Sequence, residues 1–226
     1  MNALPLVLAA HGTADPAGRA VVEAYAGALA REVAPLPVRY GYVDVCGPSV
    51  TEVLAETGPA VVVPLFLASG YHVEVDVPRA VRGVAGSVAT SAIGPEPALA
   101  GALADRLHEA GLRRSDRVVL VAAGSSRPRS LTDTTSTAAR LAALLERPVD
   151  VGYLSAGEPR AEDAVRAARD TSGGRVAVAT CLLAPGVFAD RAAALPADLV
   201  SAPLGVHPAL VRLLSERGRR TDPAVA

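Results

Sequence analysis

The sequence predicts an α/β protein of two tandem halves, each a four-stranded parallel sheet flanked by helices. Three observations support this. Short apolar runs alternate with longer Ala-rich helical patterns, which is typical of βαβ units. Half of the residues are hydrophobic but only 3% are aromatic and none is Trp, so the core must consist of Ala, Val and Leu, which pack well against a parallel sheet. The second half also repeats the first.

Eight apolar runs are predicted to be strands. They lie near residues 5–10, 38–45, 60–67 and 88–93 in the first half, and near 117–122, 149–154, 175–183 and 198–202 in the second. Helical patterns fill the gaps between them. In the first of these, Asp15 is predicted as the N-cap and Pro16 as the first helical residue, because these residue types suit those positions. Apolar residues from Val21 to Val33 then recur on one face.

The internal repeat defines the expected domains. "LVLAAHGTADP" from Leu6 aligns without a gap on "VVLVAAGSSRP" from Val118, an offset of 112 residues. Three more segment pairs follow in the same order at offsets of 111 to 116: "GYVDVCGPSV" with "GYLSAGEPRA", "FLASGYHVEVD" with "LLAPGVFADRA", and "PALAGALADR" with "PALVRLLSER". We therefore predict domains at 1–112 and 113–217, related by a pseudo-twofold axis, and a flexible tail at 218–226.

Charge and cysteine content exclude several classes of partner. The formal net charge is -1 and no run of Lys and Arg could follow a phosphate backbone, which argues against nucleic acids and anionic membranes. The two cysteines show no ligand spacing, as expected in a reducing compartment without a disulfide framework or zinc cluster. The first residues lack a cationic segment and reach His11 after a short apolar run, so neither a signal peptide nor a membrane span is predicted. We expect a cytoplasmic protein that acts on a small molecule.

Ionisable residues gather where strands of the first half end. His11 ends the first strand, Asp44 the second, and His72 follows the third. Ligands of open parallel sheets bind at the carboxyl ends of the strands, so these side chains are expected to face one crevice. The corresponding residues of the second half are Ala123, Ser155 and Phe188, which do not ligate a divalent metal. The first copy is therefore predicted to carry the site, and the second to keep only the scaffold.

Several assignments around this crevice stay open. As a strand, "HVEVDVP" places His72, Glu74 and Asp76 on one face; as a helical turn it aligns His72 with Asp76 while Glu74 points away. The flanking Gly and Pro favour a loop entering a helix, with Asp76 near the N-cap in a structural role. Glu74 is either a site carboxylate or a solvated charge. Asp44 is either a ligand or a turn residue, and Cys46 is interpreted as an inert thiol.

Two imidazoles and a carboxylate form an incomplete coordination sphere. Imidazole suits Fe, Co, Ni and Zn, and open positions are typical of catalytic or transfer sites rather than of structural zinc. Imidazole also titrates near pH 6.5, so it can accept a proton from a substrate nitrogen. Metal delivery and proton removal are the two tasks of inserting a metal into a tetrapyrrole.

Two motifs resemble those of a known family. "LAAHGTADP" is similar to the N-terminal His-Gly-Ser/Thr motif of the class II tetrapyrrole chelatases, and "PLFLASGYHVEVDVP" resembles their Pro-x-Phe-Leu-x-x-Gly-x-His-x-x-x-Asp-Ile-Pro segment, with Val77 in place of Ile. The fit is to the long-form sirohydrochlorin chelatases, which are tandems of two chelatase-like halves with one active site. The resemblance implies ATP-independent insertion of Fe²⁺ or Co²⁺, with Ni²⁺ as a further candidate, into sirohydrochlorin for sirohaem or cobalamin synthesis.

The resemblance also implies site residues. His11 and His72 would be the metal-binding and catalytic histidines, and Asp44 stands where relatives commonly have Glu. Glu74 completes the candidate metal ligands. The tetrapyrrole would bind between the halves, where guanidinium groups would meet its carboxylates. The candidates are Arg127, Arg129 and Arg191, each of which is either a substrate-binding residue or an ordinary surface charge. We expect a monomer without an iron-sulfur cluster.

The sequence fits two other enzyme classes less well. No Walker loop is present, because "HGTADPAGRA" lacks the Lys-Ser/Thr that reaches phosphate, so no nucleotide is expected. "LAAHGT" also resembles the Arg-His-Gly motif of histidine phosphatases, but Ala10 replaces the Arg that would clamp a phosphoryl group. The stronger alternative is a metal or tetrapyrrole carrier that uses the same histidines without turnover.

Overall fold

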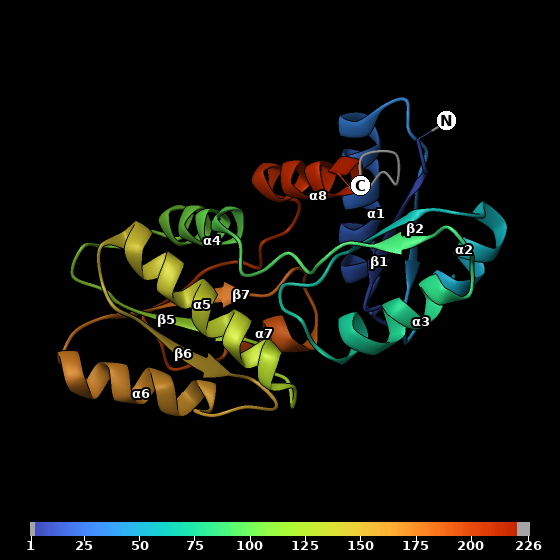
Figure 1. Ribbon diagram of the computed structural model, residues 1–226. Helices are drawn as coiled ribbons and strands as arrows, with labels where there is room; N and C mark the ends of the chain where they lie inside the picture. Colours follow the sequence, from blue (N-terminus) through green and yellow to red (C-terminus); the bar gives the residue numbers. More distant parts are fainter. Residues whose placement is uncertain (1–2, 221–226) are drawn as a thin grey trace. The chain divides into compact units, whose positions relative to one another are not determined.

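The computed structural model describes residues 3–220, and the chain separates into two compact units (Figure 1). The first unit comprises the residues up to Ile93 together with those from Val206 onward, and the second is Gly94–Gly205. Each contains a four-stranded parallel sheet, with strand orders β2-β1-β3-β4 and β6-β5-β7-β8. The predicted α/β class with two tandem halves of this kind is confirmed.

The first unit follows the predicted order of strands and helices. Its strands are β1 (Leu6–Ala10), β2 (Val38–Tyr42), β3 (Val61–Pro64) and β4 (Val88–Ala89). Its helices are α1 (Pro16–Val33), α2 (Val50–Thr57), the π-helix η1 (His72–Asp76), α3 (Val77–Arg82) and α8 (Pro208–Arg220). The predicted cap of α1 is confirmed, since Asp15 accepts a hydrogen bond from the Ala17 N–H and Pro16 begins the helix.

The second unit has the same succession of elements. Its strands are β5 (Arg117–Ala122), β6 (Val149–Tyr153), β7 (Val176–Cys181) and β8 (Leu199–Val200). Its helices are α4 (Pro97–Glu109), α5 (Pro128–Leu145), α6 (Ala161–Ser172) and α7 (Val187–Ala193). All eight predicted strands therefore form, although most end earlier than their apolar runs.

Alternate residues of each central strand point to opposite layers of helices. In the first unit, Val7 and Ala9 of β1 pack in a core with α2 and α3, while α1 and α8 pack against each other and α8 contacts β3 (Figure 1). In the second unit, Val119 and Val121 of β5 pack with α6 and α7, and α4 and α5 pack together. Both faces of each sheet are covered, as parallel sheets require.

The last helix of each sequence repeat belongs to the compact unit of the other repeat. Helix α4 packs against α5 and β7, and its Arg106 donates hydrogen bonds to the Leu204 carbonyl at 3.0 and 2.7 Å. Helix α8 packs against α1, and its Arg217 donates to the carbonyls of Ser91, Ala92 and Ile93. These two arginines occupy equivalent positions of the repeat.

The compact units therefore do not follow the expected boundary between residues 112 and 113. Helices α4 and α8 have similar apolar patterns, and each packs in the compact unit that holds the sheet of the other repeat. Of the expected tail at 218–226, residues 218–220 continue α8, and 221–226 lie outside the described residues.

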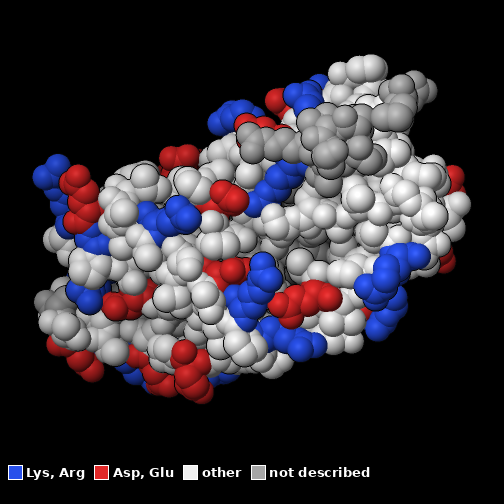
Figure 2. Space-filling view, in the orientation of Figure 1, with Lys and Arg blue, Asp and Glu red and all other residues white. Residues whose placement is uncertain are grey.

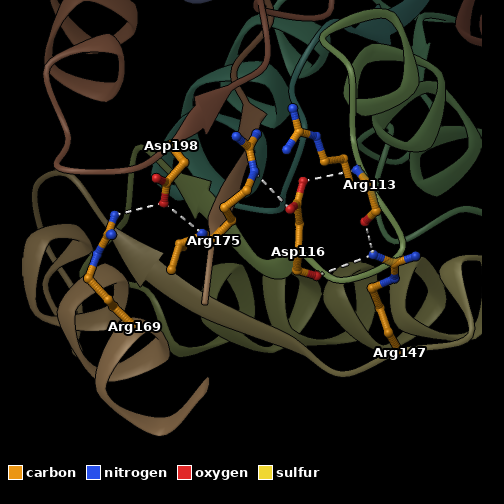
Figure 3. Close-up of polar contacts among 7 residues, drawn as sticks. Arg113, Asp116, Arg147, Arg169, Arg175 and Asp198 are labelled. Atoms are coloured by element: carbon orange, nitrogen blue, oxygen red, sulfur yellow. Dashed lines mark hydrogen bonds and ion pairs between the residues drawn. The ribbon is translucent and has the colours of Figure 1, made fainter. Parts of the chain in front are cut away.

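A polar network joins the amino ends of the strands in the second unit (Figure 3). The Asp116 carboxylate is fully buried and accepts hydrogen bonds from Arg175 Nε at 3.1 Å and from the Arg113 N–H at 2.9 Å. Asp198 accepts from the Val176 N–H and from Arg169. Because these residues precede β5, β7 and β8, the network holds the sheet at the edge opposite the carboxyl ends of its strands.

Charges of both signs are interspersed on the face of the described residues that Figure 2 shows. This agrees with a formal net charge of -1 distributed over 22 basic and 23 acidic residues. Among the described helices, none has the length and apolar character that a bilayer crossing demands.

Candidate metal centre

His11 stands at the carboxyl end of the central strand of the first sheet. Strand β1 ends at Ala10, and the His11 side chain is exposed, with its Nδ1 3.0 Å from the Gly12 carbonyl oxygen. Gly12 has φ +97°, and a Cβ there would lie 2.0 Å from the Asp44 carbonyl oxygen. Only glycine allows the two loops to approach this closely. The Asp44 N–H donates to the His11 carbonyl at 3.0 Å, which fixes the loop that carries the imidazole.

His72 begins the π-helix that follows β3. Strand β3 ends at Pro64, and in η1 the Val77 N–H donates to the His72 carbonyl five residues earlier. The helical interpretation of "HVEVDVP" is thus the one observed. His72 Nδ1 lies 2.7 Å from Asp76 Oδ2, as expected for residues four apart on a helical turn. Short π-helical segments are rare and frequently accompany functional sites.

The two histidines come from separate loops and lie against each other. Their ring centroids are 4.6 Å apart and their planes are perpendicular. Phe66 stacks on His72 at 6.1 Å, and Tyr71 meets the same ring edge-on at 5.8 Å. The imidazole pair thus comes from the loop after β1 and from the start of η1, and two aromatic side chains contact the His72 ring.

The structure does not gather all four candidate metal ligands. Within residues 3–220, no three His, Cys, Asp or Glu side chains form a group able to hold a metal ion. Asp44 is exposed, and its Oδ1 accepts from the Val45 N–H at 2.7 Å, which supports the left-handed conformation of Val45 with φ 67°. Asp44 therefore acts as a turn residue here. Glu74 is exposed in the η1 turn.

Two ionisable groups at the carboxyl ends of strands, one in each unit, have raised pKa values. Burial, followed by the charge of Cys46, raises the pKa of Tyr42 at the end of β2. Burial raises the pKa of the Cys181 thiol at the end of β7 to about 12. A thiolate ligand at Cys181 is therefore strongly disfavoured.

The three candidate arginines all lie in the second unit. Arg127 is the N-cap residue of α5 and Arg129 is exposed in its first turn. Arg191 of α7 donates to the Leu154 carbonyl, and its guanidinium carbon lies 5.7 Å from the centre of the Phe188 ring. Part of the hydrogen-bonding capacity of Arg191 is thus used within its own unit.

The second unit repeats the loop geometry without the histidines. A Cβ on Gly124 would lie 2.0 Å from the Ala156 carbonyl oxygen, the same distance as at Gly12. The Ser155 N–H donates to the Ala123 carbonyl at 2.8 Å, as the Asp44 N–H does to that of His11. Phe188 replaces His72 and is 39% exposed. The backbone of these loops is therefore shared by both copies, and the histidine pair is present only in the first.

Sequence reasoning missed the side chains that surround the histidine pair. Phe66 and Tyr71 contact His72, and Val45, which follows Asp44, is 57% exposed. The chain has only two Phe and five Tyr, so an aromatic pair within seven positions of one histidine was an available signal. Exposed apolar side chains beside polar ligands favour a partly apolar ligand.

Comparison with known proteins agrees with this architecture. A curated sirohydrochlorin cobaltochelatase of Methanopyrus kandleri is 38% identical over 79 residues, which are 33% of this chain and 55% of the relative, so the chain spans little more than half the length of that protein. The structure titled SirB from Bacillus subtilis with Fe³⁺ superposes with a TM-score of 0.83 at 21% identity, covering 98% of this chain and 96% of the other. This match shows a common fold.

A further solved structure and a family profile extend the match. The structure described as CbiX, the terminal enzyme for biosynthesis of siroheme in denitrifying bacteria, has a TM-score of 0.70 at 25% identity and covers 96% of this chain and 99% of that one. The CbiX family profile matches twice, over residues 5–110 and 117–221, once in each repeat. The chain therefore belongs to the CbiX family, which confirms the resemblance to the long-form class II chelatases that its two histidine motifs indicated.

Proposed function

We propose that this protein inserts a divalent metal, Fe²⁺ or Co²⁺, into sirohydrochlorin without ATP. The observation that carries the proposal is the pair of imidazoles, His11 and His72, whose centroids lie 4.6 Å apart at the carboxyl edge of the first sheet. Membership of the CbiX family supports the proposal, as does the likeness to proteins named for sirohydrochlorin chelation.

The reaction uses an imidazole lone pair in two steps. An imidazole nitrogen first holds the incoming ion, which replaces part of its hydration shell. As the ion enters the macrocycle, two pyrrole N–H protons must leave, and a neutral imidazole can accept one. The net exchange is one M²⁺ bound for two H⁺ released, so no nucleotide is required. Tyr71, which is exposed and contacts the His72 ring, offers an apolar surface for the flat ring.

The choice between iron and cobalt follows from supply and geometry more than from ligand type. Imidazoles bind both ions, and Ni²⁺ as well. One relative is named as a cobaltochelatase, whereas another structure contains Fe³⁺. We propose Fe²⁺ or Co²⁺ as the physiological metal, and parallel metallation kinetics with each ion would rank them.

Arginines of the second unit are proposed to meet the peripheral carboxylates of the substrate. Guanidinium groups match carboxylates in a bidentate geometry. The Arg129 side chain is exposed and forms no hydrogen bond or ion pair with any described residue, so it is the most available of the three candidates. Arg129→Ala should raise the KM for the tetrapyrrole and leave the affinity for the metal unchanged.

An absorbance assay with sirohydrochlorin, Co²⁺ and protein tests the proposal. A chelatase accelerates metallation at substoichiometric protein over many turnovers. A metal or tetrapyrrole carrier, the alternative function, changes the spectrum only in proportion to the protein added. The second outcome would replace the enzymatic proposal with the carrier.

Histidine variants assign the reaction to the site. His11→Ala and His72→Ala should each slow metallation by at least about 100-fold, the usual range for loss of a proton-transfer or ligand group. His108→Ala, which removes an exposed histidine of α4, is the matched control and should react like the wild type. Equal activity of all three variants would place the chemistry elsewhere.

A further inference from the structure

We propose that Asp76 is a positioning residue that holds the His72 imidazole with its proton on Nδ1, so that Nε2 keeps its lone pair for the metal or for a pyrrole proton. The inference rests on the proposed function, because it assumes that His72 binds the metal or accepts a pyrrole proton. Its evidence is a contact, a local helix type and an internal comparison between the two units.

The contact itself selects the tautomer. His72 Nδ1 lies 2.7 Å from Asp76 Oδ2, and both side chains are mostly buried, with exposed fractions of 25% and 22%. A carboxylate only accepts hydrogen bonds, so the shared proton sits on Nδ1 of the imidazole. Arg79 reaches the other carboxylate oxygen at 3.4 Å, but its side chain is 68% exposed and adds little.

His11 is held in the same tautomer by its own backbone. Its Nδ1 is 3.0 Å from the Gly12 carbonyl oxygen, which also only accepts. In the part of the chain that the structure describes, neither histidine uses Nε2 in a hydrogen bond. Both rings are therefore anchored through Nδ1, and each keeps Nε2 for a ligand.

The π-helix and the missing cap show that Asp76 is not simply a helix-starting residue. Asp76 precedes α3, yet its side chain makes no capping hydrogen bond to that helix. Asp76 does occupy the expected N-cap position, but its carboxylate contacts His72 instead of capping the helix. A π-helix over His72–Asp76 accompanies this contact.

The second unit has lost both members of the pair. The repeat alignment places Phe188 at the position of His72 and Ala192 at that of Asp76. There the segment Val187–Ala193 is an ordinary α-helix, and Ala192 is fully buried. If Asp76 served only the fold, the second copy would have the same use for a carboxylate. The absence of both residues in one copy fits a functional pair.

Removing Asp76 should release the tautomer and weaken metal binding. A proton on Nε2 would occupy the position that the metal needs, so part of the population would become unable to bind. Partners that orient a metal-binding histidine in this way typically change metal affinity by about 10–100-fold when they are removed. We expect a loss in this range for Asp76→Ala and a smaller loss for Asp76→Asn, whose amide oxygen can still accept the Nδ1 proton.

Two measurements on the metal-free and tetrapyrrole-free protein test the inference. Nitrogen-15 NMR of the histidine side chains reports which nitrogen of His72 is protonated, and an absorbance titration with Co²⁺ reports affinity. Glu32→Gln, which removes an exposed carboxylate from α1, controls for the change of charge. A double-mutant cycle with His72→Ala separates positioning from a general effect on the fold.

The expected results are an Nδ1–H tautomer in the wild type, its loss in Asp76→Ala, and no further effect of Asp76→Ala on Co²⁺ affinity once His72 is already Ala. The inference would be overturned by an Nε2–H tautomer in the wild type or by a wild type that does not bind Co²⁺. It would also be overturned if Asp76→Ala left the Co²⁺ affinity unchanged, or if it lowered that affinity equally in the His72→Ala background. Because neither measurement uses sirohydrochlorin, a carrier result in the metallation assay would refute the proposed function without affecting this test.

Discussion

The crossed terminal helices predict which unit each helix stabilises. Leu103 of α4 and Leu214 of α8 are equivalent positions of the repeat and are both fully buried. Leu214→Ala should destabilise the first unit, which holds β1 and β3, although residue 214 is in the second sequence repeat. Leu103→Ala should destabilise the second unit, which holds β5 and β7, although residue 103 is in the first.

The expected magnitude follows from complete burial. Truncating a fully buried Leu to Ala costs about 2–5 kcal/mol, the sum of the lost transfer free energy and of the cavity left behind. At about 1.4 kcal/mol per factor of ten, the lower limit raises the opening equilibrium of the affected unit about 30-fold. The two substitutions remove the same atoms from similar helices, so any difference between them reflects where each helix packs.

Amide hydrogen exchange read separately for each strand is the appropriate assay, because it resolves opening unit by unit. In Leu214→Ala, the amides of β1 and β3 should exchange about 30-fold faster or more, with much smaller changes in β5 and β7. Leu103→Ala should show the reverse. Faster exchange confined to the strands of the same sequence repeat would refute the crossed arrangement.

Two further predictions concern single residues. Gly12→Ala and Gly124→Ala introduce the same clash, a Cβ 2.0 Å from a carbonyl oxygen, so both substitutions should lower the melting temperature. Only Gly12→Ala should also weaken Co²⁺ binding in an absorbance titration. Wild-type Co²⁺ affinity in Gly12→Ala would contradict our account of the loop. The hydrogen bond from the Val176 N–H, assisted by Arg169, holds the pKa of Asp198 below its ordinary value of 3.8. The ionised carboxylate therefore stabilises the fold at pH values above 3.8. This stabilisation is lost as the pH falls through the depressed pKa. Asp198→Asn should therefore be less stable than the wild type in denaturant unfolding at pH 7, with a difference that closes in acid; a difference independent of pH would mean that the charge is not involved.

The strands and the repeat were predictable because both depend on local patterns. Apolar runs bounded by Gly and Pro locate all eight strands, and the nearly constant offset relates the two copies. Strand ends were less predictable: the run near 38–45 stops as a strand at Tyr42, because Val45 adopts φ 67° and turns the chain toward α2. Periodicity alone does not contain that backbone conformation.

The candidate site was predictable in its histidines and less so in their surroundings. The carboxyl-edge rule places His11 and His72 on one edge, and the structure brings their rings to 4.6 Å. The contact between His72 and Asp76 depends on a helical turn, which the flanking Gly and Pro favoured over a strand that would place Glu74 beside them. The exchange of α4 and α8 was not predictable, because similar amphipathic patterns do not reveal which of two similar sheets they cover.

The order of synthesis gives the exchange of helices a biological meaning. The unit that carries His11 and His72 cannot complete its helical layer until α8 has been translated, and α8 follows the entire second unit in the chain. The second unit, by contrast, is one uninterrupted segment, so all of its elements are translated before α8. A nascent or prematurely terminated chain therefore presents His11 and His72 on a unit that still lacks α8 from its helical layer.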